Sequence, residues 1–216
     1  MKKFTKMWAI AACALFAGTA AVNAEDYTWK FVTAGDATTY AIRSDGSLWS
    51  WGWNEKGQGG NGVSERTATP TLADGNRVWK KAVGGKAYGF FLAEDGSLWA
   101  AGTHEGGVQG TNDGIDHKVL TRIGTDNDWA DMACSRFWGY SGFAIKTNGT
   151  LWAWGKNSAG QLGIGNTQAQ TAPVQVGADM DWKQVAAGCS SVLALKTDGS
   201  LWGWGFNMYS ELFGHE

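Results

Sequence analysis

Residues 147–155 read Thr-Asn-Gly-Thr-Leu-Trp-Ala-Trp-Gly, a turn followed by a short strand in which tryptophan alternates with smaller residues. The same arrangement occurs at residues 44–52, 94–102 and 197–205. Asn-Gly or Asp-Gly between two apolar segments is a strong short-range sign of a β-hairpin, and a two-residue loop requires positive φ at both central residues. Four such turns at corresponding places therefore predict four hairpins.

Each hairpin lies within a longer repeat of about fifty residues. A unit begins at a tryptophan, continues through an apolar strand, turns, and returns through the tryptophan strand; the leading residues are Trp29, Trp79, Trp129 and Trp182. Neighbouring side chains such as Leu48 and Trp49 point to opposite faces of the returning strand, so both faces need cover. A repeat of this length indicates stacked blades. The units are predicted to span residues 29–78, 79–128, 129–181 and 182–216.

Glycine and tryptophan dominate the composition. The 216 residues include 32 glycines and 14 tryptophans but two prolines, which is typical of many short strands joined by tight turns. Glycine-rich runs follow the returning strand at residues 54–59 and 157–165. They lack the Gly-Lys-Ser/Thr ending of a phosphate-binding loop, so we interpret them as turns.

The repeated motifs together resemble the regulator of chromosome condensation repeat family, from Trp29 to about Gly214. They are the leading tryptophan, Ala-Ile/Leu-Lys, Asp-Gly-Ser-Leu-Trp-x-Trp-Gly and Asn-x-x-Gly-Gln-Leu-Gly. The resemblance implies a β-propeller of four-stranded blades, which family members usually close as a ring of seven blades. This chain has four units, carries Ala101 where the other units have tryptophan, and ends before a final outer strand.

We therefore expect an all-β fold, a β-propeller of four-stranded blades with about four blades, incomplete or open. An open arc, an assembly of two chains and a shortened gene product are the three interpretations. An open arc exposes blade faces and strand edges, which favours self-association to complete the propeller.

The first 24 residues have the pattern of a bacterial secretory signal. A basic start with Lys2, Lys3 and Lys6 precedes an apolar stretch at residues 7–22, which is too short to span a membrane. Cleavage after Ala24 would leave residues 25–216 as a single repeat domain. Cys13 as a lipoprotein acceptor is the alternative. We predict a secreted or periplasmic protein without stable membrane insertion.

Charge and motifs exclude several function classes. The chain has 18 basic and 20 acidic residues and no basic patch, so no nucleic-acid partner is expected. The three histidines are scattered and no nucleophile motif is present, which predicts no enzyme, metal or cofactor. The acids at residues 126–131 and 179–181 are interpreted as solvated connectors, with weak calcium binding as the alternative. Cys134 and Cys189 are either one disulfide of an exported chain or two small buried residues.

One loop stands out as a candidate binding site. The stretch at residues 136–142 is three residues longer than its counterparts and is rich in side chains that often dominate interfaces. The candidate contacts are Arg136, Phe137, Trp138 and Tyr140, extended by Tyr88 from the preceding unit. In the alternative interpretation Phe137, Trp138 and Tyr140 plug the end of the propeller.

The sequence thus predicts an exported, non-enzymatic protein-binding or scaffold module whose protein partner is unidentified. A carbohydrate-binding module is the alternative, because Trp53 and Trp138 lie outside the repeated columns. The family resemblance also implies an enzyme inhibitor or a guanine-nucleotide-exchange regulator as a further alternative.

Overall fold

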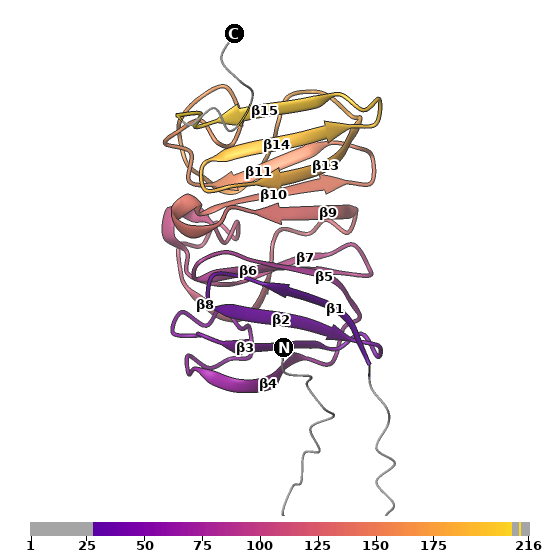
Figure 1. Cartoon of the computed structure of the whole chain (residues 1–216), viewed down its shortest axis with the longest axis vertical. Coiled ribbons are helices and arrows are strands. Elements are labelled where there is room, and N and C mark those ends of the chain that lie inside the picture. Colours follow the sequence, from indigo (N-terminus) through magenta and orange to yellow (C-terminus); the bar gives the residue numbers. More distant parts are fainter. Residues whose placement is uncertain (1–27, 209–211, 213–216) are drawn as a thin grey trace, which may run out of the picture.

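The computed structural model describes residues 28–208 and 212, and the regular secondary structure of this part of the chain is almost entirely β-strand. Four antiparallel sheets are stacked in sequence order, with the first at the lower end of Figure 1 and the last at the upper end. The expected all-β, open propeller is confirmed, because no described strand joins the first sheet to the last. The predicted signal at residues 1–24 lies outside the described residues.

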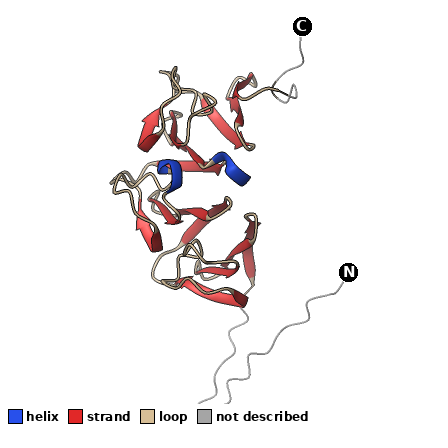
Figure 2. Cartoon of the chain, turned by 90° about the vertical axis from the view of Figure 1, so that its left-hand side faces the viewer, coloured by secondary structure: helices blue, strands red, loops and turns tan. Residues whose placement is uncertain are grey.

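Each sheet is a meander in which consecutive strands pair. The strands are β1 (Trp29–Ala34), β2 (Thr38–Arg43), β3 (Leu48–Gly52) and β4 (Thr67–Asp74); β5 (Trp79–Gly84), β6 (Tyr88–Ala93), β7 (Leu98–Gly102) and β8 (His117–Arg122); β9 (Trp129–Cys134), β10 (Ser141–Lys146), β11 (Leu151–Gly155) and β12 (Gln170–Gln175); and β13 (Trp182–Ala187), β14 (Ser191–Lys196) and β15 (Leu201–Gly205). Within the described ranges the helices are two 3₁₀ turns, η1 (Glu105–Gly107) and η2 (Phe137–Gly139), drawn in blue in Figure 2. No described helix has the length and hydropathy to cross a membrane.

The four hairpin turns differ from the expected two-residue loops. Gly46 has a φ of 88° and its N–H donates to the carbonyl of Arg43, but Asp45 is not left-handed. The turns at Gly96, Gly149 and Gly199 have the same form. The prediction of positive φ at both residues is therefore wrong, and a type I turn followed by a left-handed glycine fits these bonds instead.

The aspartate of each turn has a different role from the one predicted. Oδ1 of Asp45 accepts hydrogen bonds from the N–H and hydroxyl of Ser47, and Oγ of Ser47 accepts one at 2.8 Å from Nε1 of Trp49. The same relay occurs in the other units, starting from Asp95, Asn148 and Asp198. The serine bonds hold the pKa of Asp45 below its ordinary value. The motif Asp-Gly-Ser-Leu-Trp thus fixes the edge of the returning tryptophan.

A cation covers the tryptophan pair of the first, third and fourth units, and in the second unit Arg77 covers Trp99. The guanidinium of Arg43 lies 3.6 Å from the ring centre of Trp49, and Nζ of Lys146 lies 4.9 Å from Trp129. Lys146 also pairs with Asp126 at 2.6 Å and with Asp128 at 3.1 Å. Burial acts to lower the pKa of Lys146, but these two carboxylates outweigh it and raise the pKa.

The acidic connectors are therefore not simply solvated. In the fourth unit Lys196 pairs in the same way with Asp179 and Asp181. The interpretation as solvated connectors is corrected on this point: the acids hold the lysine that covers the indoles.

Neighbouring units are joined by a repeated backbone hydrogen bond. The carbonyls of the turn glycines Gly46, Gly96 and Gly149 accept from the N–H of the next leading tryptophan, at 2.9, 3.2 and 3.1 Å. We call the side of a unit that carries its leading tryptophan and the residue three places later its leading face. The trailing face carries the aliphatic residues of its second strand and the leucine of its returning strand. Each junction buries one trailing face against one leading face.

The second tryptophan of the returning strand completes the second and third junctions. Nε1 of Trp154 donates to the carbonyl of Val108 at 2.8 Å, and Nε1 of Trp204 donates to the carbonyl of Gln161 at 2.9 Å. A Cβ on Gly110 would lie 2.9 Å from the Trp154 ring, so this glycine permits the close approach. The glycine runs are therefore turns that receive an indole from the next unit.

Both cysteines within the described residues are free. Cys134 is buried, and burial raises the pKa of its thiol to about 12. Cys189 is exposed. The interpretation as two small buried residues holds for Cys134 and is wrong for Cys189.

Candidate partner-binding site

The longer loop of the third unit forms an exposed projection between β9 and β10. Phe137 and Trp138 each keep 60% of their surface exposed, and Arg136 is also exposed. Large apolar side chains are usually buried, so two neighbouring exposed aromatic rings require an explanation. The structure therefore presents three of the five predicted contacts to solvent.

The other two predicted contacts are buried beneath this loop. Tyr88 and Tyr140 are almost completely covered, and their ring centres are 5.9 Å apart. The hydroxyl of Tyr88 donates to the carbonyl of Ser135 at 2.6 Å, which ties the loop to the second unit. Burial, with a smaller contribution from Glu105, raises the pKa of Tyr140 to about 12. These two tyrosines belong to the core between the second and third units and support the loop from inside.

The backbone of the loop is held in an unusual conformation. Phe137 has a φ of 50° and Tyr140 a φ of 44°, in the left-handed region that bulky residues avoid. The N–H of Arg136 donates to the carbonyl of Gly188 at 3.1 Å, which fixes the loop to the fourth unit. Anchors on both neighbouring units therefore hold the exposed rings in a defined position.

A lysine that the sequence reasoning did not select joins this surface. Nζ of Lys86 lies over the ring of Trp138, so the indole stacks between solvent and a cation from the second unit. Lys86 stands two residues before Tyr88, in the stretch that corresponds to the longer loop. The correspondence between these two stretches was the sequence feature that could have identified Lys86. We define the loop patch as Lys86, Arg136, Phe137 and Trp138.

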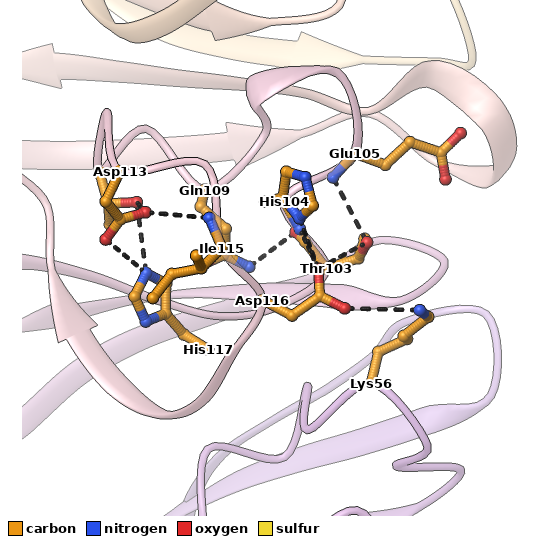
Figure 3. Close-up of polar contacts among 10 residues, drawn as sticks. Lys56, Thr103, His104, Glu105, Gln109, Asp113, Ile115, Asp116 and His117 are labelled. Atoms are coloured by element: carbon orange, nitrogen blue, oxygen red, sulfur yellow. Dashed lines mark hydrogen bonds and ion pairs between the residues drawn. The ribbon is translucent and has the colours of Figure 1, made fainter.

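A second polar cluster surrounds η1 (Figure 3). Nδ1 of His104 lies 2.7 Å from Oδ1 of Asp116, and Nε2 of His117 lies 2.8 Å from Oδ2 of Asp113. Nζ of Lys56 reaches Asp116 from the first unit at 3.4 Å. Burial acts to raise the pKa of Asp116, but hydrogen bonds from His104 outweigh it and lower the pKa.

This cluster has a structural task. It holds the loop in the unit that lacks the Gly-Gln-Leu-Gly run. The hydroxyl of Thr111 lies 3.4 Å from Nε2 of His117 and donates to Oδ1 of Asp113 at 2.8 Å, so it belongs to the same loop-holding network. Across the described ranges no three His, Cys, Asp or Glu side chains are grouped as a metal site. The chemistry available at the loop patch is stacking, apolar contact and cationic hydrogen bonding.

An open hollow of about 490 Å³ lies on the first unit and is lined by Trp51, Trp53 and Arg66, among others. Trp53 is one of the two tryptophans outside the repeated columns. Two indoles beside a guanidinium offer flat apolar area next to a hydrogen-bond donor. This hollow gives the carbohydrate alternative a physical location.

Comparison with known proteins decides the family. The family model described as "Regulator of chromosome condensation (RCC1) repeat" matches residues 45–92 and 148–195. A second model with the same description matches residues 29–58. The chain belongs to the RCC1 repeat family. The resemblance drawn from the motifs is therefore confirmed.

RCC1-repeat relatives include proteins of several kinds. The chain is 30% identical to the ultraviolet-B receptor UVR8 of Arabidopsis thaliana, over 74% of this chain and 37% of the relative. It is 27% identical to protein RCC2 of Homo sapiens, over 68% of this chain and 19% of the relative. Yeast RCC1 (Prp20), solved with Kap60 bound, superposes with a TM-score of 0.72 at 23% identity, over 84% of this chain and 44% of that chain. The chain thus spans less than half of each of these proteins.

Proposed function

We propose that this chain is an exported, non-enzymatic bacterial module that binds a protein partner through the loop patch. The observation that carries the proposal is the pair of exposed rings, Phe137 and Trp138, on a strained loop anchored to both neighbouring units. An observed backbone outlier is a reason to look for function, because the surrounding structure must maintain it. Tryptophan and arginine are also enriched among the residues that dominate protein interfaces.

The charges of the loop patch indicate the kind of partner. Lys86 and Arg136 flank the two rings, and the side chain of Arg136 is exposed. We expect a partner surface with carboxylates around an apolar pocket, because guanidinium and carboxylate groups match in geometry. The Kap60 complex of yeast RCC1 supports protein binding as a use of this family's fold.

Export and cell location depend on the sequence of the first 24 residues. The basic start and the apolar stretch support secretion or a periplasmic location. Expression of the full chain with N-terminal sequencing of the product tests this. A product that begins at Glu25 in the secreted or periplasmic fraction is expected, and an uncleaved cytoplasmic chain would contradict it.

Binding through the loop patch is tested by capture and by measured affinity. The purified chain captures a protein from the envelope and secreted fractions, and titration calorimetry then compares wild type with a Phe137→Ala, Trp138→Ala variant. We expect the dissociation constant to rise about 30-fold or more, equivalent to about 2 kcal/mol. Ile115→Ala is the matched control, since Ile115 is similarly exposed at 56% but lies outside the loop patch. Equal affinity of the double variant would contradict the proposal.

Carbohydrate binding is the second candidate, and the hollow beside Trp53 favours it. Titration with glycan fragments and readout of tryptophan fluorescence tests this function. A saturable change that disappears in Trp53→Ala and persists in Trp138→Ala would favour the sugar site. Inhibition of an enzyme and guanine-nucleotide exchange are narrower forms of the protein-binding proposal, and the activity of the captured partner distinguishes them.

A further inference from the structure

The two ends of the stack expose the same kinds of surface that every internal junction buries. The leading tryptophans Trp79, Trp129 and Trp182 are at most 6% exposed, whereas Trp29, at the start of the first unit, is 47% exposed. The residue three places later is buried in the second, third and fourth units but is 66% exposed at Val32. The leading face of the first unit is therefore a junction surface without its neighbour among the described residues.

The trailing face of the fourth unit shows the complementary difference. The leucine of the returning strand is fully buried as Leu48, Leu98 and Leu151, but Leu201 is 52% exposed. Leu193 and Leu195 of β14 are half-buried, whereas their counterparts in the first three units are buried. Both open faces thus carry the same kinds of residues that the three junctions bury.

The backbone shows the same pattern. A Cβ on Gly46, Gly96 or Gly149 would collide with the segment just before the next leading tryptophan, because each glycine packs directly under that segment. No described atom lies within 4 Å of a Cβ on Gly199. The carbonyl of Gly199 and the N–H of Trp29 correspond to the acceptor and donor of the three junction bonds. They belong to the fourth and first units, whose sheets lie at opposite ends of the stack (Figure 1).

We infer that two copies of this chain associate head to tail, the trailing face of each fourth unit packing on the leading face of the partner's first unit. A single copy cannot make this contact with itself, since the two faces lie at opposite ends of the stack. A junction between unlike faces closes into a ring when the rotation fits and otherwise continues as a filament. Two copies contribute eight units and two new junctions. Eight blades lie within the range of blade numbers that closed propellers have.

The sequences of the two faces suit this occupant. The leading face of the first unit retains the tryptophan and an aliphatic residue at Val32, as the fourth unit does at Trp182 and Val185. The trailing face of the fourth unit retains leucines at the positions that pack in the first three junctions. A second copy therefore supplies a surface of the type that the fold already buries three times.

Sedimentation velocity of the purified chain over a range of concentrations tests this inference. We expect wild type to approach the mass of two chains, while Val32→Asp and Leu201→Asp each raise the dimer dissociation constant at least about 100-fold, because a carboxylate is then buried against apolar surface. Ile115→Asp is the control at a matched exposure, with no expected change. Circular dichroism checks that the variants remain folded, which their exposed positions predict.

Mixing the two variants provides the decisive comparison. Each Val32→Asp chain keeps an intact trailing face and each Leu201→Asp chain an intact leading face, so the mixture forms one head-to-tail junction that neither variant forms alone. Recovery of dimer only in the mixture supports the inference. A wild-type monomer at all concentrations, an open-ended series of larger species, or a dimer that persists in both single variants would overturn the two-chain ring.

Discussion

The first and second junctions fill the same space with different side chains. At the second junction Ala144 lies beside Trp154, whose indole occupies the gap and bonds to Val108. At the first junction the corresponding residues are Phe91 and Ala101. The large side chain has moved from the returning strand to the strand before it, because the Phe91 ring lies against Gly89 as the Trp154 indole lies against Gly142.

The hydrogen bond of the missing indole is also replaced. At the first junction the hydroxyl of Tyr40 donates to the carbonyl of Gln58 at 2.9 Å, in the place where Trp154 and Trp204 use Nε1. Phe91 packs on the Tyr40 ring with centres 5.2 Å apart. The comparison shows that the space at a junction is filled and that the loop carbonyl accepts a hydrogen bond in each case. Different side chains can fill the space and donate this bond.

Removal of the compensating ring should have the largest effect. Phe91→Ala leaves a cavity between the first two units and should lower the free energy of unfolding by about 3–5 kcal/mol. Urea unfolding followed by tryptophan fluorescence measures the change. Phe137→Ala is the control, because Phe137 is exposed and its loss should change stability by less than about 0.5 kcal/mol. Similar small changes for both variants would show that Phe91 does not fill the junction.

Restoring the tryptophan tests whether the two arrangements are alternatives. Ala101→Trp alone overfills the junction and should destabilise the protein by about 1–3 kcal/mol. Combined with Phe91→Ala it reproduces the pairing of Ala144 and Trp154, so the double variant should be more stable than the sum of the single effects by about 2 kcal/mol. Urea unfolding of wild type, the two single variants and the double variant gives the four free energies of this double-mutant cycle. Strict additivity would contradict the compensation.

The hydroxyl of Tyr40 should have a smaller effect. Tyr40→Phe keeps the ring and leaves the buried carbonyl of Gln58 without its donor, which should cost about 1–3 kcal/mol. Thr121→Val is the control, because it removes an exposed hydroxyl that also donates to a backbone carbonyl. If the two substitutions have equal effects on the urea midpoint, the hydrogen bond does not replace that of the indole.

The turn aspartates should give the smallest effect, visible mainly in acid. Hydrogen bonds from Ser97 lower the pKa of Asp95, so its stabilising contribution is complete above the unfolded value near about 4 and is lost as the pH falls through the folded value. Asp95→Asn keeps the acceptor, as Asn148 does naturally. We expect a change within about 0.5 kcal/mol at pH 7 and a shallower loss of thermal stability below pH 4. Asn148→Asp is the reciprocal control and should steepen that acid dependence; identical acid profiles would contradict the relay.

The sequence predicted the fold because its period and its motifs report local geometry. Tryptophan spacing located the units, and the turn motif located the hairpins. The sequence did not predict the turn conformation. The side chain of Asp45 accepts a hydrogen bond from Ser47, and the backbone of Asp45 is not left-handed. The compensation at Phe91 was also missed, since it depends on contact between two units.

For the candidate site, loop length identified Arg136, Phe137 and Trp138 correctly as exposed residues. Sequence alone could not separate them from Tyr140, because burial depends on how the neighbouring unit covers the loop. Lys86 was missed for the same reason: its contact with Trp138 joins residues about fifty positions apart. The length of the loop is visible in the sequence, whereas its contacts with the neighbouring units are not.

The backbone bond from a turn glycine to the next leading tryptophan has a consequence for how such chains can be lengthened or shuffled. Its acceptor and donor are main-chain atoms, so it does not distinguish one unit from another. The choice of neighbour is left to side chains that meet across a junction, such as Tyr40 with Phe91 and Phe90 with Trp154. A recombined gene that moves two neighbouring units together should therefore fold better than one that exchanges a single unit, because the side chains that fit together belong to different units.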